Sequence, residues 1–447
     1  MKKIFASIGA IALGATAVQA DSAAGMALGG DNSKAWSVSA TLRGFYDDNY
    51  TTAAKGNERD SLGATISPSI AFKFPMDQTT LGFRYIYGAT WYEDRSSINS
   101  GNNAWDQSHE FDALFSHAFS SRFSVDAMDS FVIAQEPGLL DDVGHHYRTE
   151  GNNIRNHGEI TFNGTITRQL SFVVGYQNTY YDYENESPFG KNNFDQPVPG
   201  AVDSSLSGLL DRIEHEALLN LRWQAMKKTV LIAGYNYKQV NYTSDEVVAN
   251  AGAIPGVFDD FRVSNTRDSR SHIFYGGVDQ NFSKDLILSV RLGAQMIENY
   301  RASANEPNDT TTSPWGSLSL TYNGFQDTTV QVGFTHARNQ TDVVTPDAAT
   351  GSITSDAQTS VLYGSVSHHF TPKLIGRLSA QWQDSEFFGG LYDGTSEKFF
   401  DAGVNFTYRF NEHFTSEIGY NFSQLNSDVP GRDYDRNRIY LGVTATY

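Results

Sequence analysis

The stretch LGATISPSIAFKF, residues 62–74, decides the fold. Every second residue is apolar, from Leu62 through Ile66 to Phe74, and the positions between them are mostly small or polar. A period of two is that of a β-strand with one apolar face. Pro68 interrupts the pattern, because proline donates no hydrogen bond to a sheet, and we expect a local bulge there.

The same alternation recurs in about 18 segments, each long enough to cross a bilayer as a tilted strand of about 9–11 residues. Their approximate centres are residues 40, 68, 86, 113, 128, 160, 175, 217, 235, 275, 291, 319, 333, 365, 379, 404, 419 and 441. The apolar period of two argues against helices almost everywhere. The segment near residue 275 has an ambiguous apolar face.

Connections between the segments alternate in length. Short turns follow the even segments, at 75–78, 120–122, 167–169, 283–285, 371–373 and 411–413. Long connections follow the odd segments, at 49–60, 93–107, 135–152, 184–208, 243–268 and 339–356. One-sided loop lengths are typical of outer-membrane barrels, which have short periplasmic turns, long outer loops and an even strand number.

The sequence therefore predicts an all-β fold, a transmembrane antiparallel up-and-down β-barrel of about 18 strands (16–18), with short periplasmic turns and long extracellular loops. Its apolar face would touch lipid, because only helices and closed barrels satisfy every backbone group inside a bilayer. Aromatic residues crowd the segment ends, as an interfacial girdle requires: Trp36, Tyr87, Trp91, Phe410, Phe414 and Tyr447. We expect the protein in the bacterial outer membrane, with outer-membrane lipid around it.

The first residues, MKKIFASIGAIALGATAVQA, have a charged start, an apolar run and a small-residue site at Ala20. This pattern predicts a secretory signal peptide over 1–20. An N-terminal membrane anchor is the alternative, but the run is shorter than the roughly 20 apolar residues that a spanning helix needs. Residues 21–34 would then form a short periplasmic linker, and residues 35–447 the barrel.

Charge and cysteine content limit the possible partners. Loss of the two lysines of the signal peptide leaves 51 acidic and 31 basic side chains and takes the formal charge from −18 to −20. This excess of acid disfavours nucleic acid as a partner. The chain has 0 Cys, so an exported protein of this sequence contains no disulfides.

The C-terminal segment ends on an aromatic residue of its apolar face. Ile439, Leu441, Val443, Ala445 and Tyr447 share that face. The pattern resembles the terminal signal by which outer-membrane barrels reach the barrel-insertion machinery, although an ordinary last strand would look similar.

A barrel of about 18 strands should enclose a water-filled lumen. Residues 21–34 are too short for a globular plug, so an internal block would have to come from loops such as 184–208 or 243–268. Strand parity predicts the charged residues that line the lumen. The candidates are Arg43, Lys73, Arg84, Glu110, Asp112, Arg212, Glu214, Glu216, Arg222, Arg291, Arg377, Asp401, Arg409 and Glu417, with Asp126, Glu159 and Lys238 on the same parity.

The two signs nearly balance on this inner face, which argues against a strongly charge-selective pore. The excess acid would then lie in the loops, at Asp47 and Asp48 among other positions. The densest cluster is RIEHEALLNLR (212–222), where neighbouring strands could supply counter-charges and form a constriction.

The motifs that contain metal-ligand or catalytic residue types do not form a metal site or a catalytic site. Residues 141–146, DDVGHH, contain metal-ligand types but lie in a loop without further spaced ligands. His368 and His369 are adjacent in a strand and face opposite sides, and the same is true of each Ser-His dipeptide, Ser116-His117 among them. We predict no enzymatic activity, no metal and no cofactor, with an embedded hydrolase as a minor alternative.

Three segments carry a family resemblance: TLRGFYDDNY (41–50), FSSRFSVDAMDSF (119–131) and HFTPKLIGRLSAQW (369–382). They resemble the putative β-barrel porin 2 family of bacterial outer-membrane proteins, and the likeness extends over nearly the whole chain after the signal. The resemblance implies a barrel and a link to exopolysaccharide export, and it supplies no site residues.

We therefore expect a porin-like channel for passive diffusion of small hydrophilic solutes. One alternative is an outer-membrane component for exopolysaccharide export, although an exit for an acidic polymer should have a basic lumen. Another is a closed barrel whose acidic surface loops bind partners or serve a structural role.

Overall fold

The computed structural model describes residues 35–97, 104–134, 152–184, 206–250, 261–301, 310–347 and 352–447. The predicted signal peptide and linker lie outside these residues, and so does the Asp-His motif at 141–146. Among the described residues, no helix is both long enough and apolar enough to cross a bilayer.

Eighteen antiparallel strands form one sheet. This confirms the predicted all-β barrel and its strand number. Each strand pairs with the next one along the chain, and β9 pairs with β12. The strands are β1 (Trp36–Asp47), β2 (Ser61–Pro75), β3 (Thr79–Tyr92), β4 (Trp105–Ala118), β5 (Phe123–Ala134), β6 (Asn153–Thr165), β7 (Leu170–Tyr183), β8 (Arg212–Met226), β9 (Thr229–Tyr242), β12 (Ser269–Asn281), β13 (Leu286–Asn299), β14 (Thr310–Phe325), β15 (Thr328–Asn339), β16 (Asp356–Thr371), β17 (Leu374–Phe388), β18 (Ser396–Arg409), β19 (Phe414–Ser427) and β20 (Tyr434–Thr446).

The sheet closes on itself between its first and last strands. Leu42 of β1 lies opposite Val443 of β20 in the register. The backbone N–H of Val38 donates to the carbonyl of Tyr447 over 3.1 Å, and the reverse bond is 2.8 Å long. Because closure leaves no free strand edge, the backbone groups of these strands pair within the barrel, as a bilayer demands.

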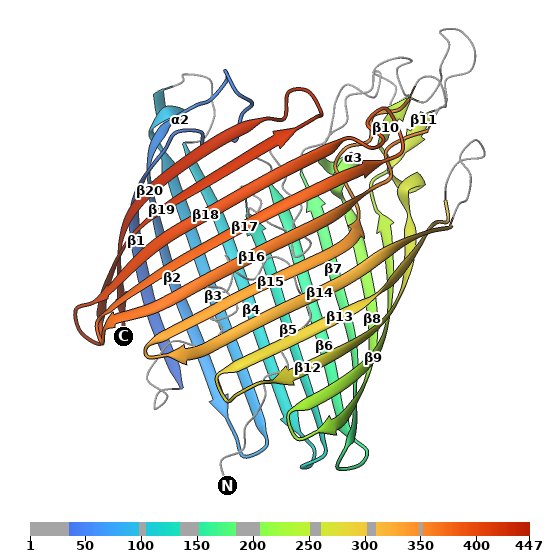
Figure 1. Cartoon of the computed structure of the whole chain (residues 1–447). Coiled ribbons are helices and arrows are strands. Elements are labelled where there is room, and N and C mark those ends of the chain that lie inside the picture. Colours follow the sequence, from blue (N-terminus) through green and yellow to red (C-terminus); the bar gives the residue numbers. More distant parts are fainter. Residues whose placement is uncertain are drawn as a thin grey trace.

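The long connections carry the remaining elements. The strands tilt strongly, with long connections at the upper end and short turns at the lower end (Figure 1). Above the barrel lie α2 (Glu93–Ser97), α3 (Leu206–Leu210), the short ribbon of β10 (Val247–Asn250) with β11 (Phe261–Val263), and the 3-10 turn η1 (Ser264–Arg267). By the rule for outer-membrane barrels, the upper end faces the outside of the cell.

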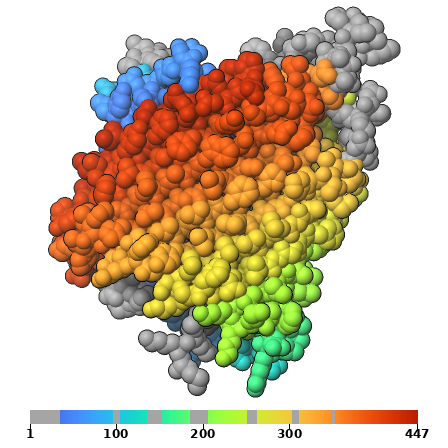
Figure 2. Space-filling model, viewed as in Figure 1, coloured from blue at the N-terminus to red at the C-terminus, as the bar shows by residue number. Residues whose placement is uncertain are grey.

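The outer surface is apolar along its middle. Leu42, Leu292 and Leu441 expose 61%, 67% and 62% of their surface, which in water would be unfavourable and in lipid is expected. The strands coloured yellow to red form an unbroken tilted wall in Figure 2. A belt of exposed phenylalanines marks the short-turn end: Phe74, Phe119, Phe123, Phe282, Phe325, Phe370, Phe410 and Phe414. Trp36 and Tyr447 meet at the same end, with their rings 5.8 Å apart.

The bulge expected at Pro68 is absent. Pro68 lies opposite Ala40, and the pairing with β1 stays in register along the whole strand. On the other side, the pairs with β3 run from Ile66–Ala89 to Ser69–Ile86 without a shift, and only the pairs between them are missing. The prediction was wrong because a strand residue directs its N–H to one neighbour only. Proline therefore removes ladder contact with β3 and leaves the β1 side intact.

Candidate functional site

The charged residues predicted for the lumen all occupy strand positions opposite in phase to the exposed apolar residues. Most of them lie in ion pairs. Arg43 of β1 and Glu417 of β19 meet across β20, with Nη2 and Oε1 2.5 Å apart. Arg84 of β3 bonds both acids of β4, Glu110 at 2.6 Å and Asp112 at 2.7 Å. These pairs place the two signs in contact along the inner wall.

One inner acid was missed from the sequence. Asp279 of β12 accepts from Arg222 of β8 at 3.0 Å and from Arg291 of β13 at 2.7 Å. The segment around residue 275 had an ambiguous face, so the phase of Asp279 could not be read. Phe274 resolves it, because it exposes 53% of its surface to the outside and its odd-numbered neighbours point inward.

The loop assignment of Asp47 was also wrong. β1 continues to Asp47, which pairs with Ser61 on one side and with Arg438 on the other. Its carboxylate is fully buried between Arg436 Nη2 at 2.7 Å and Arg438 Nε at 2.8 Å. Neither arginine was among the lumen candidates, although both share the inward parity of β20. This cluster ties the first and last strands together from inside.

The cluster at 212–222 receives its counter-charge from β9. Glu214 accepts a 2.7 Å bond from Arg212 Nε and another of 2.7 Å from Lys238 Nζ. Arg212 and Glu214 are only 1% and 7% exposed. Hydrogen bonds in which both groups are charged are roughly twice as strong as neutral ones.

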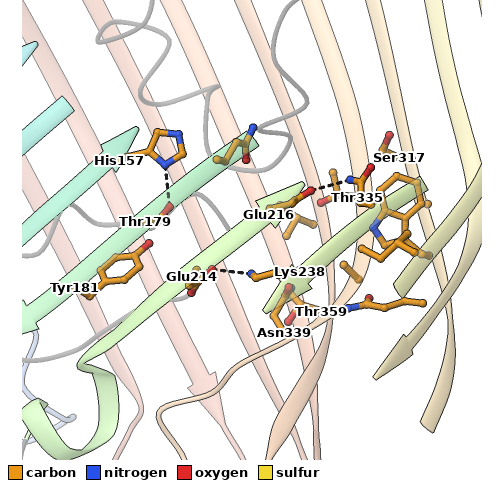
Figure 3. A pocket seen from close by; sticks show the side chains of 18 residues that line it. His157, Thr179, Tyr181, Glu214, Glu216, Lys238, Ser317, Thr335, Asn339 and Thr359 are labelled. Carbon is orange, nitrogen blue, oxygen red and sulfur yellow. Dashed lines mark hydrogen bonds and ion pairs between the residues drawn. The ribbon is translucent and has the colours of Figure 1, made fainter. Parts of the chain in front are cut away.

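A cavity of about 150 Å³ lies beside this cluster. Most of its lining comes from two walls, with Ile273 of β12 and Gln295 of β13 between them, and Figure 3 shows side chains of both walls pointing into the same space. Strands β6–β9 contribute His157, Thr179, Tyr181, Glu214, Glu216 and Lys238. The facing strands β14–β16 contribute the neutral side chains Ser317, Thr335, Asn339 and Thr359.

Hydrogen bonds hold the charged wall in place. Asn236 Nδ2 donates to Glu216 Oε1 at 2.7 Å, and His157 Nδ1 lies 2.8 Å from the Thr179 hydroxyl. No described residue donates to the second carboxylate oxygen of Glu216. This oxygen of the Glu216 carboxylate is therefore available to accept a hydrogen bond from a solute in the cavity.

Two arginines tie the long connections together above the barrel. Arg267 at the end of η1 donates to the carbonyl of Leu209 in α3 at 3.0 Å and to the carbonyl of Thr341. Arg432, in the β19–β20 connection, bonds Asp342 at 2.9 Å and Glu397 at 2.7 Å. Burial disfavours the charged form of Arg432, but the two carboxylates outweigh it and raise the pKa of Arg432.

One carboxyl group of the upper end titrates near neutral pH. Burial raises the pKa of Asp211, between α3 and β8, to about 6. Hydrogen bonds from the Ser207 hydroxyl and from the backbone N–H of Tyr183 oppose this rise, while Asp182 and Glu246 add to it. Asp211 joins α3 to β7, so its charge is coupled to the packing of this part of the upper end.

No group of three or more His, Asp or Glu side chains in the described ranges could hold a metal ion. The Asp-His motif at 141–146 is outside those ranges, so its interpretation stays a prediction.

A closed barrel with an apolar exterior and a charged, hydrogen-bonded interior defines the protein as an outer-membrane β-barrel of porin-like type, and its location is the bacterial outer membrane. Residues 264–447 match the model of the family described as Putative beta-barrel porin 2. The resemblance seen in the sequence is thereby confirmed for this part of the chain.

Solved structures with a similar arrangement are outer-membrane barrels. A mutant of the ferric enterobactin receptor PfeA from Pseudomonas aeruginosa is 11% identical, with a TM-score of 0.45 over 92% of this chain and 80% of that chain. OccAB4 from Acinetobacter baumannii is 11% identical, with a TM-score of 0.43 over 93% and 99% of the two chains. The outer membrane protein opdK from Pseudomonas aeruginosa is 11% identical, with a TM-score of 0.42 over 92% and 99%. A search of curated proteins found no match to this sequence.

Proposed function

We propose that the barrel is a channel for passive diffusion of small hydrophilic solutes across the outer membrane. The observation that carries this proposal is the cavity of about 150 Å³ inside the barrel, which is lined by both polar and apolar side chains. A buried water needs only about 10–15 Å³ of such space, so the cavity has room for several waters or one small solute.

The inner charges support a pore of weak ion selectivity. Arg43, Arg84 and Arg222 each contact an acid of a neighbouring strand or of the next strand but one. Paired charges of opposite sign largely cancel at a distance, whereas rings of one sign make a pore selective. A neutral polar solute would meet hydroxyl and amide groups without a strong electrostatic barrier.

The test is single-channel conductance of the purified protein in planar bilayers, at high and at low salt. Large, discrete, ohmic steps with weak ion selectivity are expected. Heat-denatured protein from the same preparation is the control for contaminating pores. An absence of steps, from protein shown to be folded and inserted, would overturn the channel.

The same recording separates the two alternatives. Strong anion selectivity would favour a component for export of an acidic exopolysaccharide. A silent, folded barrel would favour the closed barrel with surface-binding loops. The contacts of Arg267 and Arg432 are the observation on which that last alternative rests, since they link several long connections at the upper end.

A further inference from the structure

A row of four inward side chains runs along the charged wall, and three of them line the cavity while the fourth, Glu159, lies next to its lining. In the register, Glu159 of β6 lies opposite Gln177 of β7, Gln177 opposite Glu216 of β8, and Glu216 opposite Lys238 of β9. Neighbouring strands are about 4.8 Å apart, so Gln177 separates the two glutamates by roughly 10 Å along the wall.

Hydrogen-bond acceptors exceed donors in this row. Glu159 Oε1 accepts from the Thr161 hydroxyl at 2.9 Å, but Glu159 Oε2 is buried without a partner. Glu216 uses one oxygen for Asn236 and leaves the other open. Lys238, the one cation of the row, is directed to Glu214 at 2.7 Å. An unpaired buried acceptor is unfavourable, and a solute that brings N–H donors would satisfy it.

The net charge around the cavity is negative, as the excess of carboxylate acceptors would lead us to expect. The charged residues of the lining are Glu214, Glu216 and Lys238. Arg212, which does not line the cavity, neutralises Glu214. Glu159 adds a further negative charge next to the lining. Arg155 shares the inward face of β6, but it is four residues from Glu159, roughly 13 Å along the strand, and it does not line the cavity.

The remaining surface of the cavity suits an uncharged solute body. The facing wall presents hydroxyl and amide groups and apolar side chains, and it carries no charge. The polar residues include Ser317, Thr335 and Thr359, and the apolar ones Trp315 and Val361. The formal charge of the whole chain, −18, also concentrates cations near the protein. A dedicated passage for anions would require positive charge around the cavity and a positively charged protein.

From these observations we infer that the cavity is a binding site for a small organic cation with an ammonium or guanidinium group. Glu216 accepts from the cationic group, Gln177 provides a neighbouring acceptor, and Glu159 adds negative charge beside the lining. A guanidinium group is planar and matches a carboxylate with two parallel N–H donors. This inference rests on the proposed channel, since the cavity is reached through the lumen.

The experiment compares methylguanidinium with methylurea, a neutral probe of closely similar shape. Binding to the folded protein in detergent is measured by calorimetry, and reduction of the single-channel current is measured in bilayers. Methylguanidinium should bind and reduce the current at concentrations at which methylurea does neither. Glu216→Gln should weaken binding at least tenfold. The matched control is Glu412→Gln, which removes the same charge from an exposed residue of a short turn and should leave binding unchanged.

The outcomes separate the site from the channel. A conducting protein that binds neither probe, or binds both equally, overturns the cation site and leaves the channel standing. Binding of methylguanidinium that is lost in Glu216→Gln, in a protein that never conducts, supports the site and overturns the channel. Equal loss of binding in the Glu412→Gln control would show a general charge effect and would also overturn the site.

Discussion

Lys238 lies opposite Glu216 in the register of β8 and β9, yet its Nζ binds Glu214, 2.7 Å from Oε2. The diagonal contact places Lys238 and Arg212 on the same carboxylate and leaves Glu216 with an amide partner only. Glu214 is thus neutralised by two cations, whereas Glu216 faces the cavity with an open oxygen.

The first prediction concerns this contact. Lys238→Met should destabilise the barrel by about 3 kcal/mol, because the buried cluster then keeps the carboxylates of Glu214 and Glu216 with Arg212 as their one counter-charge and carries an uncompensated negative charge. The midpoint of urea unfolding, followed by tryptophan fluorescence, measures the effect. Adding Glu214→Gln to Lys238→Met should recover part of the loss. A single variant as stable as the wild type would show that the pair contributes nothing.

The second prediction concerns pH and the packing of α3. The pKa of Asp211 is about 6 in the folded protein, against an ordinary value near 3.8. The protonated carboxyl group is therefore favoured by folding, and its contribution is complete below pH 4 and lost as the pH rises through 6. With allowance for partial solvent exposure, local opening of residues 206–211 should be about 1 kcal/mol less favourable at pH 5 than at pH 7.5.

Hydrogen exchange of those amides at the two pH values, corrected for intrinsic rates, measures this difference. Asp211→Asn keeps an acceptor for the N–H of Tyr183 and removes the titration, so its exchange should be independent of pH. An unchanged pH dependence in Asp211→Asn would assign the effect to another group.

The third prediction concerns the links above the barrel. Arg267→Ala removes the donors that bind the carbonyls of Leu209 and Thr341. Limited proteolysis within residues 206–268 should become at least tenfold faster, because two connections lose a shared contact. The proteolysis rate of Arg267→Lys should lie between those of the wild type and Arg267→Ala, since lysine keeps the charge and loses the planar geometry. Arg301→Ala is the control, because Arg301 is exposed and, within the part of the chain that the structure describes, forms an ion pair with Asp268 alone.

The fourth prediction concerns a carboxylate on the lipid side. Asp129 of β5 lies opposite Ala113 and Gly158, in phase with the exposed Phe131 and bonded by Asn156 at 3.1 Å. An acid on the lipid face costs stability. The double variant Asp129→Leu/Asn156→Leu should therefore be more stable by about 1 kcal/mol, because it removes both polar groups together. Unfolding in lipid vesicles provides the measurement, and a destabilised double variant would contradict the assignment of this face to lipid.

Local patterns in the chain were enough to predict the barrel. Alternation with a period of two is a property of a few consecutive residues, so the stretch at 62–74 already identifies one face for lipid and one for the lumen. Loop lengths that alternate around each segment then define the two ends. For the same reason, parity placed Arg43 and Glu417 on the inner face without any knowledge of their contact.

Contacts between strands lay beyond such reasoning. Which residue meets which depends on register and closure, and these are set by the pairing of residues far apart in the chain, such as Leu42 with Val443. The clamp of Asp47 by Arg436 and Arg438 exists only because β1 closes against β20. The contact of Lys238 with Glu214 rather than Glu216 depends on the diagonal between the neighbouring strands β8 and β9. The cavity beside them is formed by side chains of distant strands that face the same space. Parity is a local property of one strand and can be predicted from the sequence, whereas a site is made by several strands and depends on their register and closure.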